Sequence, residues 1–138
     1  MTFSYAPTPM LVHKKWGTEE IIVNSDYCGK RMTVMPGRTC SIHYHHKKTE
    51  TFFVLDGRLA LELYYPYCAG SDPKLVGCKL LMPGRSLTIH PLVPHRFWAH
   101  SEPVRFIEFS TTDMSEDSIR LSESGEVSPS CLLAEGVW

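Results

Sequence analysis

The amino-acid sequence predicts an all-β domain, a sandwich or a barrel, and three features of the chain support this fold class. Glycine and proline recur about every ten residues, and both favour turns. Short runs rich in β-branched and aromatic residues lie between these turns, as is typical of strands. No window of about eleven or more residues before Asp113 has the apolar spacing of an amphipathic helix.

Each predicted strand is bounded by turn residues. The predicted strands are residues 19–23, 30–35, 51–55, 59–65 and 104–109. A polar turn at residues 24–26 separates the first two. Asp56-Gly57 lies between the third and the fourth and favours a type I′ turn, so we expect these two strands to form a β-hairpin. Residues 66–77 predict a looser polar loop with little apolar content.

The length of 138 residues is that of one domain and excludes a second domain of useful size. We expect an N-terminal arm at residues 1–11, a barrel at residues 12–112 and a C-terminal extension at residues 113–138. The acidic, serine-rich part of this extension, residues 113–126, is expected to be extended or to form a short helix. The apolar residues from Cys131 onward are expected to dock on the body or on a second subunit.

The chain carries 14 Lys and Arg residues against 15 Asp and Glu residues, a formal net charge of −1. This balance excludes nucleic acid as the main partner, because phosphate binding needs a basic face. No run approaches the ~18–20 apolar residues of a membrane helix. The N-terminus lacks the basic-then-apolar pattern of a signal peptide. We therefore expect a cytoplasmic protein without a membrane partner.

The five cysteines are odd in number and irregular in spacing, so they do not predict a disulfide framework. None forms a Cys-x-x-Cys pair, which argues against a redox motif or a thiolate zinc site. We expect most of these side chains to be small buried hydrophobes or surface thiols.

The segment around His43 and His45 concentrates residues that bind metals. Residues two apart in a strand point the same way, so these two imidazoles share one face. Glu50 begins the next apolar strand, where a carboxylate is costly unless it is paired or coordinated. If the chain turns at residues 46–48, Glu50 returns beside His45. His95 is the candidate fourth ligand, because a proline-bounded turn delivers it to the start of an aromatic strand.

Three imidazoles and one carboxylate leave one or two coordination positions open for water or substrate. Such a set suits Mn²⁺, Fe²⁺, Ni²⁺, Co²⁺ or Zn²⁺, and the ligands alone do not choose among these ions. Metal ligands come in clusters, so isolated histidines are expected to be ordinary surface or core residues. The histidines in this class are His13, His46, His90 and His100.

These residues resemble the two sequence motifs of the cupin family. Every fixed position of the first motif is matched, by Gly37, His43, His45, Glu50 and Gly57. The second motif is matched in a degenerate form, without the usual glycine shortly before its last histidine, by Gly84, His90, Pro91 and His95. The resemblance implies a double-stranded β-helix, the cupin jelly-roll barrel. It assigns metal-ligand roles to His43, His45, Glu50 and His95.

The two ends of the predicted barrel carry a narrower resemblance. Residues 12–20, which contain Trp16-Gly17, resemble the start of cupins related to type II mannose-6-phosphate isomerase. Residues 106–112 and 117–120 are similar to the end of small sugar-isomerase-like cupins, including D-lyxose isomerases. In those proteins the segment after a Ser-Thr pair is often rich in histidine, whereas here it is Thr-Asp-Met.

The resemblance implies a metal-dependent aldose–ketose isomerase or epimerase that acts on a sugar or a sugar phosphate. In this hypothesis the metal holds two substrate oxygens and stabilises an enediolate. Glu108 is the candidate base, because it is an acid in an otherwise apolar strand, where burial would raise its pKa. Lys30 is the candidate group that steadies a developing oxyanion or binds a substrate phosphate.

Four further residues are candidates for substrate binding. Phe52 and Phe97 are expected to line or back the pocket. Glu62 and Arg96 are polar strand residues that alternation could direct into it. Three other function classes stay open. They are a metal-dependent dioxygenase, a non-catalytic cupin that binds a carbohydrate or another small molecule, and a non-catalytic cupin that uses the barrel only for dimerisation. Edge strands and apolar patches also predict a homodimer.

Overall fold

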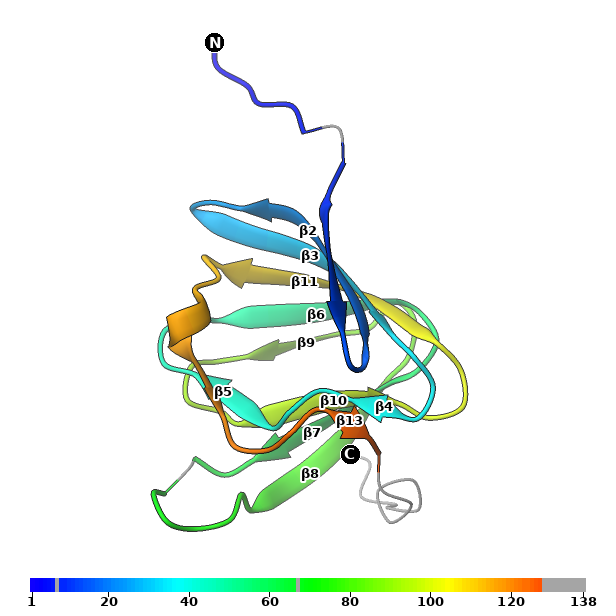
Figure 1. Cartoon of the computed structure of the whole chain (residues 1–138), viewed down its shortest axis with the longest axis vertical. Helices are drawn as coiled ribbons and strands as arrows, with labels where there is room; N and C mark the ends of the chain where they lie inside the picture. Colours follow the sequence, from blue (N-terminus) through cyan, green and yellow to red (C-terminus); the bar gives the residue numbers. More distant parts are fainter. Residues whose placement is uncertain (7, 67, 128–138) are drawn as a thin grey trace.

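The computed structural model describes residues 1–6, 8–66 and 68–127, which form two β-sheets packed face to face (Figure 1). The strands are β1 (Met10–Lys14), β2 (Gly17–Asn24), β3 (Tyr27–Val34), β4 (Arg38–Thr39), β5 (His43–His45), β6 (Glu50–Asp56), β7 (Leu59–Tyr64), β8 (Leu75–Leu81), β9 (Ser86–Ile89), β10 (His95–Ala99), β11 (Val104–Thr111), β12 (Ser118–Arg120) and β13 (Gly125–Glu126). A short 3-10 helix, η1 (Ser115–Asp117), precedes β12. The described residues contain no helix long and apolar enough to span a membrane. The prediction of an all-β fold is confirmed.

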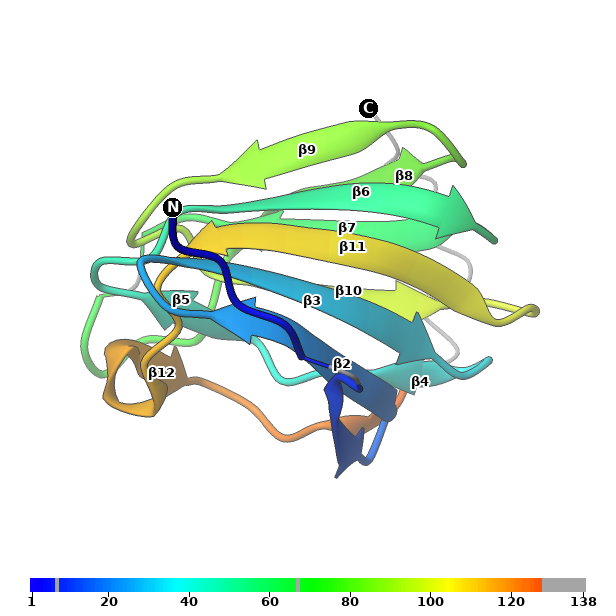
Figure 2. The same ribbon diagram turned by 90° about the horizontal axis from the view of Figure 1, so that it is seen from above.

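The chain winds back and forth between the two sheets. The first sheet has six strands in the order β1-β2-β3-β11-β6-β9. The second has the order β12-β5-β10-β4-β13, with β7 paired to β10 and β8 paired to β7. Consecutive strands such as β6 and β7, or β9 and β10, belong to different sheets (Figure 2). This alternation between two antiparallel layers is the jelly-roll arrangement.

The apolar core lies directly beneath a polar site. Phe52 of β6, Phe97 of β10 and Phe106 of β11 are buried, and their ring centroids are 5.0–6.0 Å apart. Burial of each such side chain stabilises the fold by about 1.5–3 kcal/mol. Since residues two apart share a face of a strand, each aromatic has an inward neighbour two positions away. These neighbours are Glu50, His95 and Glu108, all buried.

The β1–β2 hairpin closes one side of the sandwich. Trp16 at its turn is 5% exposed, and its ring meets Phe97 of the second sheet edge-on, with centroids 5.0 Å apart. Such an aromatic pair contributes about 0.5–1.5 kcal/mol beyond the burial of its area. Because the hairpin belongs to the first sheet, this contact ties the two sheets together on the side where the hairpin lies (Figure 1).

The predicted β-hairpin at Asp56-Gly57 is wrong. β6 pairs with β11 and β9 in the first sheet, whereas β7 pairs with β10 and β8 in the second. Gly57 does adopt a left-handed backbone conformation, with a φ of +75°. The tight turn therefore exists, but it carries the chain from one sheet to the other. A local preference for a turn does not specify which sheet receives the next strand.

Substitution of Gly57 by alanine is expected to lower the free energy of unfolding by about 2–5 kcal/mol. The left-handed conformation costs a residue with a Cβ about 1–2 kcal/mol, and a steric clash adds about 1–3 kcal/mol. The clash arises because a Cβ at Gly57 would lie 2.3 Å from the carbonyl oxygen of Pro103. Urea denaturation measures the loss. Gly84 is the matched control, since its φ is +83° and a Cβ there would meet nothing within 4 Å. Equal losses in Gly57→Ala and Gly84→Ala would contradict the steric argument.

The segment after Thr111 joins the edge of the second sheet. β12 pairs with β5, and β13 pairs with β4, so residues 113–126 contain both the extended and the short helical structure that was expected. Two boundaries differ from expectation. β1 begins at Met10, inside the predicted arm, and β8 begins at Leu75, inside the predicted loop. Residues 131–138 lie outside the described residues, and their docking stays a prediction.

Candidate metal centre

A cavity of about 690 Å³ opens between the sheets. Residues of the β1–β2 turn, of η1 and of β12 belong to its lining, and Figure 2 shows these segments along one side of the sandwich. Its interior wall carries His43 and His45 of β5, Phe52 of β6 and Glu108 of β11. Its rim carries residues of the β1–β2 turn and of β12.

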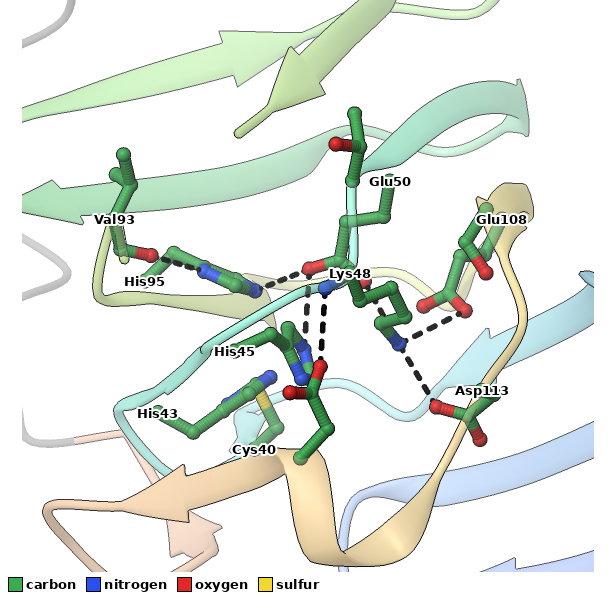
Figure 3. A network of polar contacts seen from close by, with 12 residues as sticks. Cys40, His43, His45, Lys48, Glu50, Val93, His95, Glu108 and Asp113 are labelled. Carbon is green, nitrogen blue, oxygen red and sulfur yellow. Dashed lines mark hydrogen bonds and ion pairs between the residues drawn. The ribbon is translucent and has the colours of Figure 1, made fainter. Parts of the chain in front are cut away.

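Four side chains converge beside this cavity (Figure 3), and two of them line it. Each offers one ligand atom, and these atoms all lie within 4.8 Å of one another; the residues are His43, His45, Glu50 and His95. β5 supplies two of them, and the first residues of β6 and β10 supply the others. In the β10–β5 pair, His95 lies directly opposite His43. The fold therefore brings together all four residues that the sequence pattern selected.

Several polar atoms of this group are buried and face one another. The Nδ1 of His95 donates to the carbonyl oxygen of Val93 at 2.9 Å, and in a neutral ring this leaves a lone pair on Nε2. That Nε2 lies 2.6 Å from Oε1 of Glu50, yet neither atom has a hydrogen-bond partner. Both ring nitrogens of His45 are also buried without a hydrogen-bond partner. Buried polar atoms left unpaired are costly, and a shared cation would satisfy Glu50 Oε1, His95 Nε2 and one nitrogen of His45.

The protonation state of His43 also fits a metal ligand. Its Nδ1 lies 2.8 Å from the carbonyl oxygen of Ser41, and such a bond to a backbone carbonyl fixes the tautomer of metal-binding histidines. Burial, and then the neighbouring ring of His95, lower the pKa of His43 to about 3. The ring is therefore neutral at pH 7. Three imidazoles and one carboxylate form a donor set that fits a divalent transition metal.

Lys48 lies beside the ligand group, and sequence reasoning did not select it. Its Nζ lies 3.2 Å from Oε2 of Glu50, 3.5 Å from Oε2 of Glu108 and 3.1 Å from Oδ1 of Asp113 (Figure 3). The side chain of Lys48 is 4% exposed, so these contacts are shielded from solvent. A signal was present in the sequence, because Lys48 precedes Glu50 by two positions, the spacing that puts side chains on one face.

Glu108 and Lys30 face each other across the β11–β3 pair. Both are buried and both line the cavity. The Nζ of Lys30 lies 2.8 Å from Oδ2 of Asp113 and 3.2 Å from Oε1 of Glu19. Its charge is thus already matched by two carboxylates. Asp113 contacts both buried lysines, Lys30 through one oxygen and Lys48 through the other.

Burial and opposing charges set the pKa values of these groups. Burial, and then the carboxylate of Glu50, raise the pKa of Glu108 to about 8. Burial acts to lower the pKa of Lys48, but the carboxylates of Glu108, Glu50 and Asp113 together raise it above its usual value. A similar balance raises the pKa of Lys30. Both lysines therefore stay charged at neutral pH.

Asp117 of η1 holds the turn that carries Lys48. Its buried carboxylate accepts hydrogen bonds from the backbone N–H groups of Lys47 and Lys48, each at 3.0 Å. Its carbonyl oxygen accepts one from the N–H of His46 at 3.2 Å. Hydrogen bonds to charged groups contribute about 1.5–3 kcal/mol each. The segment after β11 therefore fixes the β5–β6 turn beside the ligand group.

The predicted substrate-binding residues divide into two pairs. Phe52 and Phe97 line the cavity as expected. Glu62 and Arg96 lie opposite each other on β7 and β10 and form an ion pair with each other. The expectation that these two side chains face the cavity is wrong. Arg96 lies between His95 and Phe97, which both point inward, so alternation directs it to the outer face of the second sheet.

The remaining histidines and cysteines behave as ordinary residues. The four histidines expected to be ordinary are all exposed, namely His13, His46, His90 and His100. The cysteines among the described residues are free thiols. Cys40 borders the cavity, but burial raises the pKa of its thiol to about 12. A thiolate ligand or nucleophile is therefore not available there at neutral pH.

A curated relative extends over much of the chain. The D-lyxose/D-mannose isomerase of Thermosediminibacter oceani is 30% identical over 121 residues. The match covers 72% of this chain and 64% of that protein. The chain thus spans slightly less than two thirds of the length of this relative.

Solved structures share the fold at low sequence identity. The capsular polysaccharide assembling protein CapF from Staphylococcus aureus is 16% identical with a TM-score of 0.69, and the match covers 87% of this chain and 35% of that one. The L-ribose isomerase of Cellulomonas parahominis, solved with L-psicose, is 19% identical with a TM-score of 0.66, covering 76% and 69%. The sequence profile described as Cupin matches residues 24–129. With this match over most of its length, the chain belongs to the cupin family.

Proposed function

We propose that this cupin is a metal-dependent sugar isomerase or epimerase that interconverts an aldose and a ketose or inverts a carbon next to a carbonyl. The observation that carries the proposal is the presence of Glu108 and Lys48 on the wall of the cavity that contains the metal-ligand group. Such a reaction moves a proton between neighbouring carbons, which needs a base beside an electrophile. The relative named D-lyxose/D-mannose isomerase supports a sugar as the substrate.

In this proposal each group on the cavity wall has a separate chemical role. A divalent metal, when bound, supplies Lewis-acid polarisation of substrate oxygens. Glu108 accepts the proton from the hydroxyl-bearing carbon beside the carbonyl, which leaves an enediolate form of the sugar, and returns it to the former carbonyl carbon. The hydroxyl proton passes to the former carbonyl oxygen. Lys48, 3.5 Å from Oε2 of Glu108, stabilises the negative charge that develops on the substrate oxygens. The rings of Phe52 and Phe97 exclude water from the reacting carbons.

Lys30 is assigned a different role from the one that the sequence suggested. Its ammonium contacts Glu19 and Asp113, whereas the ammonium of Lys48 is the one that contacts Glu50 and Glu108, beside the metal-ligand group. We propose instead that Lys30 positions Asp113. The same carboxylate then positions Lys48, whose Nζ lies 3.1 Å from its other oxygen.

Incubation in D₂O tests the proposal. Metal-loaded protein is mixed with a panel of aldopentoses and aldohexoses that includes D-lyxose and D-mannose, and NMR follows the label. We expect deuterium at the carbon that receives the transferred proton. Consumption of O₂ without deuterium in the sugar would contradict the proposal and favour a dioxygenase. Binding of a sugar with neither change would contradict it and favour a binding cupin.

Replacement of Glu108 by glutamine is expected to lower the rate of deuterium incorporation by about 10²–10⁴-fold, the usual contribution of a positioned acid or base. The metal content of the variant should not change. Glu62→Gln is the matched control, because Glu62 is a buried glutamate on the outer face of the sandwich. Equal losses of activity in the two variants would contradict a specific role of Glu108.

A further inference from the structure

The interior of the cavity is rich in carboxyl groups. Four of them surround the ammonium groups of Lys30 and Lys48. These belong to Glu19, Glu50, Glu108 and Asp113. Lys48 contacts three of the carboxylates and Lys30 contacts two. A phosphate group placed here would lose its hydration next to these carboxyl groups. The interior therefore suits neutral hydroxyl and carbonyl groups.

The rim of the cavity has the opposite charge. Its basic residues are His13, Lys14 and Lys15 at the β1–β2 turn and Arg120 of β12, and Glu123 is the acidic residue beside them. Lys14 is committed to an ion pair with Glu19 at 3.4 Å. Lys15 and Arg120 are exposed, and neither forms an ion pair within the described part of the chain. Two cationic side chains with no ion pair among the described residues thus border the opening.

The strand register brings Arg120 next to the metal-ligand group. In the antiparallel β12–β5 pair, Arg120 lies opposite His43 and Ser118 lies opposite His45. Directly opposite residues project to the same face of the sheet, with Cα atoms about 4.5–5.5 Å apart. Arg120 and Ser118 therefore border the cavity one strand outward from two of the ligands. Figure 2 shows β12 beside β5 at this edge.

We propose, on the basis of the isomerase function above, that the substrate is a phosphorylated sugar whose phosphate binds at the rim. Arg120 and Lys15 bind the phosphate while the carbonyl end of the sugar reaches the metal-ligand group. A phosphate monoester carries about −1.5 to −2 charges at pH 7, which two cations match. The planar guanidinium binds two phosphate oxygens, and the Ser118 hydroxyl offers a further donor.

Kinetics with a matched pair of substrates test this inference. The pair is D-mannose and D-mannose 6-phosphate, used with wild-type protein, Arg120→Gln and Arg58→Gln. Arg58 is the control, an exposed arginine that pairs with Glu102 and does not line the cavity. We expect Arg120→Gln to raise KM for the phosphate ester roughly 10–100-fold, as for loss of a charge-assisted hydrogen bond. Its kcat and its kinetics with the free sugar should stay within about twofold, and Arg58→Gln should resemble wild type.

A binding measurement separates this inference from the proposed function. Calorimetry compares sorbitol, sorbitol 6-phosphate and glucuronate, none of which needs to be isomerised. Tighter binding of sorbitol 6-phosphate than of sorbitol, lost in Arg120→Gln, supports the inference whether or not a sugar is isomerised. Absence of isomerisation would contradict only the proposed function. Equal binding of sorbitol and its phosphate overturns the inference, and isomerisation of free sugars then leaves the proposed function standing. Tighter binding of glucuronate than of the phosphate would assign the rim to a carboxylate and also overturn it.

Discussion

The His45→Ala variant is expected to lose its metal ion, whereas the neighbouring His46→Ala variant keeps it. His45 is buried and has no hydrogen-bond partner for either ring nitrogen, while His46 is exposed. Replacing a residue that only orients a ligand costs roughly 10–100-fold in metal affinity. Loss of a ligand itself should therefore cost at least about 100-fold. Plasma mass spectrometry of the two variants and the wild type, purified side by side, measures the metal content.

Thermodynamic stability gives an independent readout of the same site. A metal that binds the folded state alone raises the free energy of unfolding by about 4 kcal/mol at 1,000 times its Kd. At the same concentration, a variant with 100-fold weaker affinity gains only about 1.4 kcal/mol. We expect the larger gain for wild type and His46→Ala and the smaller one for His45→Ala. Stoichiometric metal and equal gains in both variants would contradict the four-residue site.

The Lys48→Met variant is expected to keep its metal and to lose at least about 100-fold in kcat. Removing a preorganised group that stabilises developing charge commonly costs about 10²–10³-fold. Lys47→Met is the matched control, because Lys47 is exposed and its backbone N–H is held by the same Asp117 carboxylate. Metal analysis and steady-state kinetics on the two variants measure the difference.

Two results would contradict this role of Lys48. If Lys48→Met loses metal and activity in parallel, the lysine serves to hold Glu50 rather than to stabilise charge on the substrate. If kcat falls equally in Lys47→Met, the conformation of the turn matters and the ammonium group does not. An unchanged KM in Lys48→Met would further support an interaction made in the transition state.

Alternation along a strand determines which face of the sheet a side chain lies on, once the face of one neighbouring residue is known. His43 and His45 lie two apart, and both reach the ligand group. Glu108 turns inward because Phe106, two residues before it, belongs to the core. The same rule places Arg96 outside, since it directly follows His95. The error at Arg96 was therefore avoidable from the sequence.

Contacts between distant segments could not be predicted in this way. Asp56-Gly57 favours a turn, but the sheet that receives β7 depends on packing across the whole sandwich. The carboxylate of Asp117 reaches the N–H of Lys48 across 69 residues of sequence. Asp113 follows β11, so its contacts with Lys30 and Lys48 depend on the position of β11 in the first sheet. The predicted homodimer concerns a second chain and stays a prediction.

The four ligand residues and the two aspartates that contact the Lys48 turn are synthesised at different times. All four ligand residues precede Ala99, whereas Asp113 and Asp117 follow β11. Synthesis proceeds from the N-terminus, and a domain generally folds as a unit. The ribosome therefore releases the complete ligand set before the segment that clamps the Lys48 turn. A nascent chain therefore contains its four metal donors before it contains Asp113 and Asp117, and an interrupted chain that ends before Asp113 would have the donors without the clamp.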